Sequence, residues 1–226
     1  MVFSHTRTNA PRTHEVDKQP MDKASFISQM SSGAAAMGIQ VSDEALARLF
    51  VYHAELERWN RKVNLVSRRP HDWIRIHFLD SLAPLALGLL GKSGRIVDLG
   101  AGAGFPGIPL KIAREGISLS MAEASGKKCA WLKHLIRALD ISEAQVLEGR
   151  FEELMDSGWA GYFDTAVSRA AAKPRKILDL GRPFLVPGGR MLVYTTEALV
   201  EEGVGKVHPY RVPGSKVPSV IWEVEI

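Results

Sequence analysis

The chain has 226 residues, of which 46% are hydrophobic and 24% are charged, and its formal net charge is +4. These values are typical of one folded domain with a sizeable core, and they exclude disorder of the whole chain. No apolar run approaches the roughly 18 residues that a membrane-spanning helix needs. The single cysteine, Cys129, excludes an internal disulfide and a cysteine-cluster metal site. We expect a cytoplasmic monomer with no metal ion and no membrane partner.

The first 92 residues are predicted to form a tail followed by helices. Residues 1–21 are polar, contain two prolines and show no apolar periodicity, so we expect a disordered tail. Apolar residues at spacings of three and four predict one helix over 23–37 and a second from its N-cap, Ser42, to about Asn60. We interpret residues 22–92 as an N-terminal helical cap.

One segment of this cap is strongly basic. Between Arg58 and His77 there are six Arg or Lys residues and a single acid, Asp72. A solvated helix face usually mixes both signs, so this bias indicates a phosphate-binding surface, with an ordinary basic surface as the alternative. The residues that we assign to RNA contact are Arg61, Lys62, Arg68, Arg69 and Arg75.

The strongest motif lies between residues 95 and 111. A short apolar run ends at Leu99, and four glycines follow within eight residues, namely Gly100, Gly102, Gly104 and Gly107. Glycines at this spacing allow the backbone to turn sharply and to approach a ligand, and the helix that follows directs free N–H groups toward it. The pattern predicts a cofactor-binding loop.

Two classes of cofactor compete for this loop. The spacing Gly-x-Gly-x-x-Gly is typical of dinucleotide-binding proteins, whereas Asp98 extends it to Asp-x-Gly-x-Gly-x-Gly, which resembles class I S-adenosylmethionine methyltransferases. A carboxylate suits a cofactor with an ammonium and a sulfonium group, and it suits a pyrophosphate poorly because like charges would meet in a confined site. We favour S-adenosyl-L-methionine. A dinucleotide-dependent oxidoreductase and a purely structural glycine turn are the alternatives.

A second cofactor contact is expected at Glu123, the end of an alternating strand over 117–124. An acid at this position can accept hydrogen bonds from both ribose hydroxyls of a nucleoside cofactor, and a surface carboxylate is the alternative. The next helix is expected to begin at its N-cap, Ser125, because apolar residues repeat every three and four positions from Cys129 onward.

The rest of the chain continues the alternation of strands and helices. We expect strands over 145–148, 163–168 and 190–194, a helix over 174–185, a turn at 187–189, and a closing strand pair over 207–212 and 219–226. This order implies an α/β fold with a mostly parallel sheet and a ligand at the carboxyl ends of its strands. Residues 93–226 are thus predicted to form a Rossmann-like methyltransferase domain with seven strands, one of them antiparallel.

Three segments, 59–67, 77–82 and 99–110, closely resemble the family of ribosomal RNA small subunit methyltransferase G, the bacterial 16S rRNA guanine-N7 methyltransferases also known as glucose-inhibited division protein B. The resemblance covers about residues 38–194. The sequence Gly-Phe-Pro-Gly-Ile-Pro-Leu at 104–110 is far more specific than the bare glycine loop.

The resemblance implies methyl transfer from S-adenosylmethionine to N7 of a guanine in the 530 loop of 16S rRNA, guanine 527 in this family, as naked rRNA or in the small ribosomal subunit. It places Phe151 and Glu152 against the adenine, and it places Arg169, at the end of the fourth strand, beside the transferred methyl group as the expected catalytic residue. A salt-bridging arginine is the alternative for Arg169. The full set of cofactor contacts that we expect is Asp98, Gly100, Gly102, Gly104, Phe105, Glu123, Phe151, Glu152 and Arg169.

The resemblance fades after residue 194. Family members usually carry a Lys-Gly pair after the fifth strand, where this chain has Thr195 and Thr196, and the basic segment before the last strand is reduced to Lys216. A further hypothesis is therefore a module that binds the cofactor and RNA but has a lost or altered methylation target.

Overall fold

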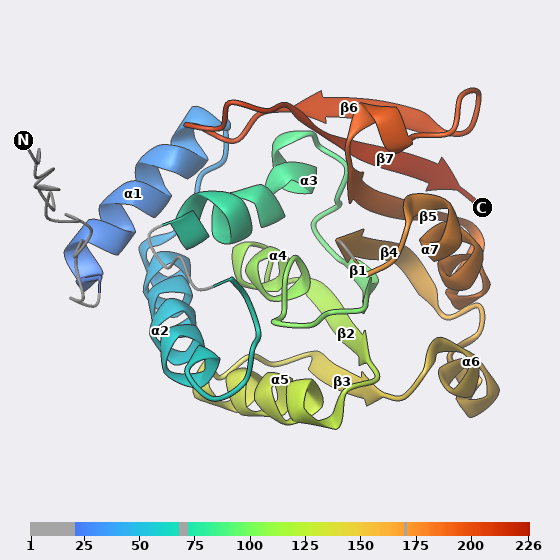
Figure 1. Ribbon diagram of the computed structural model, residues 1–226, viewed down its shortest axis with the longest axis horizontal. Helices are drawn as coiled ribbons and strands as arrows, with labels where there is room; N and C mark the ends of the chain where they lie inside the picture. The colour runs from blue at the N-terminus through green and yellow to red at the C-terminus, as the bar shows by residue number, and fades with distance from the viewer. Residues whose placement is uncertain (1–20, 68–71, 170) are drawn as a thin grey trace, which may run out of the picture.

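The computed structural model describes residues 21–67, 72–169 and 171–226 (Figure 1). The predicted tail before Met21 and two of the predicted RNA contacts, Arg68 and Arg69, lie outside the described residues. Within the described ranges, no helix combines the length and the apolarity needed to cross a membrane.

A seven-stranded sheet with the order β3-β2-β1-β4-β5-β7-β6 forms the centre of the molecule. β7 alone runs in the opposite direction to the other six strands of this sheet, and the strand order reverses between β1 and β4, which is where open α/β sheets bind ligands. The strands are β1 (Gly94–Leu99), β2 (Ile117–Glu123), β3 (Ala144–Glu148), β4 (Phe163–Arg169), β5 (Leu185–Thr195), β6 (Lys206–Tyr210) and β7 (Ser219–Glu225). The predicted fold class is confirmed.

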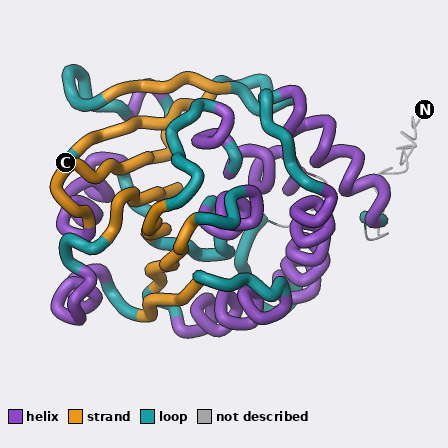
Figure 2. The backbone as a smooth tube through the Cα atoms, turned by 180° about the vertical axis from the view of Figure 1, so that it is seen from behind, coloured by secondary structure: helices purple, strands orange, loops and turns teal. Residues whose placement is uncertain are grey.

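Helices cover both faces of this sheet, as the view from behind also shows (Figure 2). One face carries α1 (Lys23–Ala36), α2 (Asp43–Asn60), the π-helix η2 (Ile74–Leu79), α3 (Ala83–Ala86), α4 (Gly107–Ala113) and α5 (Gly126–Ala138). The other face carries α6 (Phe151–Leu154), η3 (Met155–Trp159), α7 (Pro174–Gly181) and the 3₁₀ turn η4 (Arg182–Phe184). A further 3₁₀ turn, η5 (Glu197–Leu199), follows β5.

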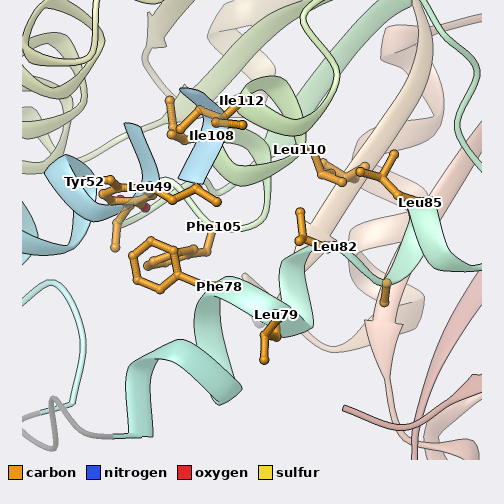
Figure 3. Close-up of a cluster of buried hydrophobic side chains, with 14 of the residues drawn as sticks. Leu49, Tyr52, Phe78, Leu79, Leu82, Leu85, Phe105, Ile108, Leu110 and Ile112 are labelled. Atoms are coloured by element: carbon orange, nitrogen blue, oxygen red, sulfur yellow. The ribbon is translucent and has the colours of Figure 1, made fainter. Parts of the chain in front are cut away.

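The N-terminal helices share one hydrophobic core with the sheet. The cluster extends from Phe26 in α1 to Ile221 in β7. At its centre, Phe105 of the glycine loop stacks on Tyr52 of α2, with 4.9 Å between ring centroids, and meets Phe78 of η2 edge to face (Figure 3). Side chains on both sides of residue 92 pack in this one cluster. The domain boundary at this residue stays a prediction.

Local signals explain the first two helices, and both predictions are confirmed. The Ser42 hydroxyl accepts a hydrogen bond from the Ala45 amide, 3.2 Å away, and so caps α2. Gly38 follows the end of α1 with a φ of 75°, a conformation that favours glycine.

Two predictions for the chain after β4 are wrong. The predicted helix over 174–185 ends at Gly181 and tightens into η4, and residues 187–189 lie inside β5 instead of forming a separate turn. Gly188 adopts a φ of 77°, and the register with β4 shifts between Phe163 and Thr165. The strand therefore contains an irregularity where the sequence suggests a break. The short elements η2, α3, α6, η3 and η5 are not predicted from the sequence.

Candidate functional site

An open pocket of about 420 Å³ lies at the carboxyl ends of β1, β2 and β3. We call it the carboxyl-end pocket, and its volume lies in the range of small-molecule sites. It brings together four predicted cofactor residues, and the other five do not line it. The lining residues are Gly100, Ala122, Glu123, Ala124, Lys128, Gly149, Arg150, Phe151, Glu152 and Ala171. Most of the lining residues that were not predicted are small, and a small residue after a strand carries no signal of its own.

Glu123 is the last residue of β2 and is only 9% exposed. Its Oε2 accepts a hydrogen bond from the Gly102 amide at 3.0 Å, and its Oε1 accepts one from the Ser125 amide at 2.8 Å. A carboxylate offers about four acceptor sites, so capacity for two hydroxyl donors remains. Glu123 thus fixes the glycine loop to the start of α5 while its carboxylate lines the pocket.

Asp98 is fully buried in β1 and acts inside the loop. Its Oδ2 accepts a hydrogen bond from the Gly107 amide at 2.8 Å, and its Oδ1 has no hydrogen-bond partner among the described residues. Burial raises the pKa of Asp98 to about 7, and the Gly107 amide and the Arg169 charge oppose this rise. The geometry places Asp98 where it shapes the turn; it does not line the carboxyl-end pocket.

Gly100 and Gly104 both have positive φ angles, 75° and 103°, but they face different surroundings. A Cβ on Gly100 would lie 2.5 Å from the Cβ of Ala171, on the wall of the carboxyl-end pocket. A Cβ on Gly104 would lie 3.0 Å from the Tyr52 hydroxyl oxygen and 3.1 Å from Cγ1 of Ile108. Protein atoms therefore fill the space beside Gly104, and this glycine serves packing.

Two helices hold the glycine loop from outside the sheet. The carbonyl oxygen of Ala103 accepts hydrogen bonds from the Tyr52 hydroxyl of α2 and from the indole N–H of Trp131 in α5, both at 2.8 Å. Phe105 is buried between Tyr52 and His77, whose ring centroid lies 5.1 Å from its own. The loop conformation thus depends on the N-terminal helices, and Phe105 belongs to the core that supports it.

Arg169 ends β4 and is bound to the segment around η2. Its Nη1 donates to the carbonyl oxygen of Ile76 at 3.0 Å and to Oδ2 of Asp80 at 2.9 Å, and its Nη2 lies 3.3 Å from Nδ1 of His77. Its Cζ also lies 5.3 Å from the centroid of the Phe105 ring. Arg169 therefore forms a salt bridge with Asp80, as the alternative interpretation of this residue expected.

His77 and Asp80 lie in one hydrogen-bonded junction with Arg169 of β4. Burial and the Arg169 charge lower the pKa of His77 to about 3, so its imidazole is neutral at neutral pH. Asp80 accepts a second hydrogen bond, 2.7 Å long, from the hydroxyl of Tyr210 in β6. The partner in β4 could not be identified from the sequence, because no spacing rule connects residues so far apart.

The described part of the basic segment lies near the surface. Arg61 and Lys62 are exposed, and Arg61 lies 3.6 Å from Glu57. Arg75 is about one-third exposed and is ion-paired with Asp72 at 3.1 Å. These residues do not line the carboxyl-end pocket.

A family model for rRNA small subunit methyltransferase G matches residues 45–220. Ribosomal RNA small subunit methyltransferase G of Stenotrophomonas maltophilia is 37% identical over 201 residues, which cover 84% of this chain and 91% of that protein. The proteins of the same name from Syntrophus aciditrophicus and Roseiflexus castenholzii are 36% and 31% identical. These two alignments cover 74% and 85% of this chain and 70% and 88% of the respective proteins.

Solved structures show the same fold. The structure of MtNAS in complex with MTA and tNA superposes with a TM-score of 0.51 at 16% identity, covering 91% of this chain and 90% of that one. The fibrillarin/Nop5p complex gives a TM-score of 0.50 at 18% identity, covering 66% of this chain and 84% of that one. From the family model and the curated relatives, the chain belongs to the family of rRNA small subunit methyltransferase G.

Proposed function

We propose that this protein binds S-adenosylmethionine in the carboxyl-end pocket and transfers its methyl group to N7 of a guanine in the 530 loop of 16S rRNA. The observation that carries the proposal is the placement of Glu123, whose carboxylate is held by the Gly102 and Ser125 amides at the wall of this pocket. Membership in the family and the names of the relatives support rRNA of the small ribosomal subunit as the substrate.

The residues present fit such a cofactor. Gly100 lies at the wall of the pocket, the Glu123 carboxylate suits the two ribose hydroxyls of the cofactor, and Phe151 and Glu152 suit the face and the edge of its adenine. We assign the other predicted cofactor residues to the support of this site. Asp98, Gly102, Gly104 and Phe105 shape the loop through the contacts described above.

S-adenosylmethionine, when bound, supplies an electrophilic methyl group. Guanine N7 is a lone-pair acceptor without a proton in the neutral base, so the protein needs no general base at this atom. Its task is alignment of the nucleophile with the methyl group. We assign part of this task to Arg169. Hydrogen bonds to Ile76, Asp80 and His77 take three of its five N–H donors, which leaves two for the target base or a phosphate.

The proposal also includes a contact between the basic segment of the cap and the phosphates of the RNA backbone. Arginine and lysine side chains bind phosphates and release counterions, which gives sequence-independent affinity. We assign this contact to Arg61, Lys62, Arg68, Arg69 and Arg75.

Two measurements test the proposed function. Calorimetry should detect binding of S-adenosylhomocysteine and none of NAD. Incubation with methyl-labelled S-adenosylmethionine should then transfer label to small ribosomal subunits or to naked 16S rRNA. Binding of NAD alone would favour a dinucleotide-dependent enzyme, and cofactor binding without transfer to either RNA would indicate a module with a lost or altered target.

A further inference from the structure

A second hollow, of about 430 Å³, lies between the carboxyl end of α2 and the middle of α5, two segments that lie side by side in Figure 1. We call it the aromatic hollow. It is lined by Arg58, Trp59, Lys62, Val63 and His134. None of these residues lines the carboxyl-end pocket, and only Lys62 among them has a part in the proposed function.

The apolar wall of the aromatic hollow is anchored in the core. The half-buried ring of Trp59 lies 5.0 Å from the ring of His134, tilted by 33°, and 5.5 Å from the fully buried ring of Trp131. His134 is fixed in turn by Glu55, whose Oε2 lies 2.7 Å from its Nε2. The two aromatic side chains are thus held in place before any ligand arrives.

The charge at the edge of the hollow is positive. Lys62 is exposed, and the Arg58 side chain is 63% exposed although it is paired with Glu55. Glu55 itself is only 18% exposed, contacts both His134 and Arg58, and does not line the hollow. A ligand that enters the hollow therefore meets aromatic rings and two cations, a combination that suits a flat ring joined to a negatively charged group.

The position of the hollow relates it to the cofactor. Lys128 lines the carboxyl-end pocket and His134 lines the aromatic hollow, and both belong to α5. Six residues of an α-helix rise about 9 Å. Nucleotides in a stacked strand lie roughly 3.4 Å apart, so the hollow lies within the length of a few nucleotides of the carboxyl-end pocket.

We propose that the aromatic hollow binds one unpaired nucleotide of the RNA substrate close to the methylated base. Its base packs against Trp59 and His134, and its phosphate lies at Lys62 and Arg58. Single-stranded RNA is recognised in this way, because aromatic side chains stack on bases of any sequence and nearby cations hold the backbone. The inference rests on the proposed function for the identity of the partner and adds to it a subsite that holds a base.

The test measures the affinity of the full chain for a fluorescent RNA hairpin that carries a single-stranded loop. Trp59→Leu removes stacking but keeps an apolar side chain, and it should weaken binding about tenfold, whereas Trp59→Phe should keep most of the affinity. Lys62→Gln should weaken binding and reduce its logarithmic salt dependence by about one unit. The matched controls are Trp159→Leu, which removes a partly buried tryptophan on the opposite face of the sheet, and Lys206→Gln in β6; both should bind RNA as the wild type does.

Crosslinking gives a direct second measurement. RNA with 5-iodouracil in its loop should crosslink to Trp59 or His134 on irradiation, and this readout does not depend on how well a variant folds. The inference is overturned if the wild type binds and methylates RNA, Trp59→Leu binds RNA as tightly as Trp159→Leu does, and crosslinks map elsewhere. The proposed function would still hold in that case, because the wild type binds and methylates RNA. A wild type that neither binds nor methylates RNA would instead overturn both.

Discussion

The guanidinium of Arg169 is ion-paired with the carboxylate of Asp80, with 2.9 Å between Nη1 and Oδ2, and each side chain is only 16% exposed. Asp80 directly follows η2 and also accepts a hydrogen bond from Tyr210 of β6. One carboxylate therefore connects the N-terminal helices, the end of β4 and the edge of the sheet. This arrangement fixes the position of Arg169 at the place where we propose that methyl transfer occurs.

Asp80→Asn should lower the free energy of unfolding by about 3 kcal/mol, because the substitution leaves a largely buried guanidinium without its counter-charge. Urea unfolding measures the change. Asp72→Asn is the matched control: its ion pair with Arg75 is about one-third exposed on each side, so its loss should cost less than about 1 kcal/mol. Equal losses in the two variants would contradict the role given to Asp80.

Arg169→Ala should reduce single-turnover methyl transfer on the order of a hundredfold, the typical effect of removing one aligning or charge-bearing contact. The affinity for S-adenosylhomocysteine, measured by calorimetry, should change much less. Asp80→Asn in the same assay separates direct from indirect effects, since it keeps the guanidinium. A similar rate loss in both variants would mean that Arg169 acts only through the junction with η2.

Glu123→Ala should weaken cofactor binding by about 1–3 kcal/mol, the scale of hydrogen bonds to a charged group. Glu123→Gln should lose less, because the amide oxygen still accepts one hydrogen bond. Calorimetry with S-adenosylhomocysteine at fixed pH measures both variants. Glu115→Gln serves as the control, since this exposed acid pairs with Arg48 and does not line the carboxyl-end pocket. If Glu123→Ala binds S-adenosylhomocysteine as tightly as this control does, Glu123 does not contact the cofactor.

Gly104→Ala tests whether this glycine serves packing. Gly38→Ala should cost only the strain of a positive φ, about 1 kcal/mol, because nothing lies within 4 Å of the added Cβ. Gly104→Ala adds contacts with Tyr52 and Ile108 and should lower the free energy of unfolding by at least twice as much as Gly38→Ala does. Thermal or urea unfolding without cofactor gives the comparison. Equal losses of unfolding free energy in the two variants would show that the glycine loop accommodates the added methyl group.

The buried carboxyl of Asp98 predicts a specific pH dependence of stability. Its pKa is about 7 in the folded state and near 3.8 when unfolded, so between these values the folded protein retains a proton that the unfolded chain releases. Stability should therefore fall as pH rises through this window, by up to about 1.4 kcal/mol per pH unit from this group. Asp98→Asn removes the effect, so the free energy of unfolding of this variant relative to wild type should rise from pH 5 to pH 7. If the free energies of unfolding of wild type and Asp98→Asn change with pH in the same way, burial does not raise the pKa of Asp98.

The sequence predicts the fold well because the signals for its main elements are local. The apolar run before Gly100, the acid at Glu123 and the cap at Ser42 each depend on a few neighbouring residues, and the strand alternation then fixes the layers. The bounds of β5 could not be predicted, because Leu185 already pairs with Phe163 of β4 before the irregularity, and the regular pairing with β4 and β7 resumes only at Arg190.

The candidate site is predicted less completely. Gly100 and Glu123 meet at one pocket because they lie at the carboxyl ends of adjacent parallel strands, which sequence order alone suggests. The surroundings of Gly104 and Arg169 depend on α2 and η2, which lie far away in the sequence. A glycine pattern therefore identifies a cofactor loop but does not show which of its residues face the ligand.

The most direct test of the central claim is to map 7-methylguanine in 16S rRNA at single-nucleotide resolution, comparing wild-type cells, a deletion strain, and deletion-strain subunits treated with purified protein and S-adenosylmethionine. We expect one modified guanine in the 530 loop that is absent from the deletion strain and restored by the protein, as the proposed function requires. Identical modification of wild-type and deletion-strain rRNA, or restoration of a methyl group at a different base, would contradict it.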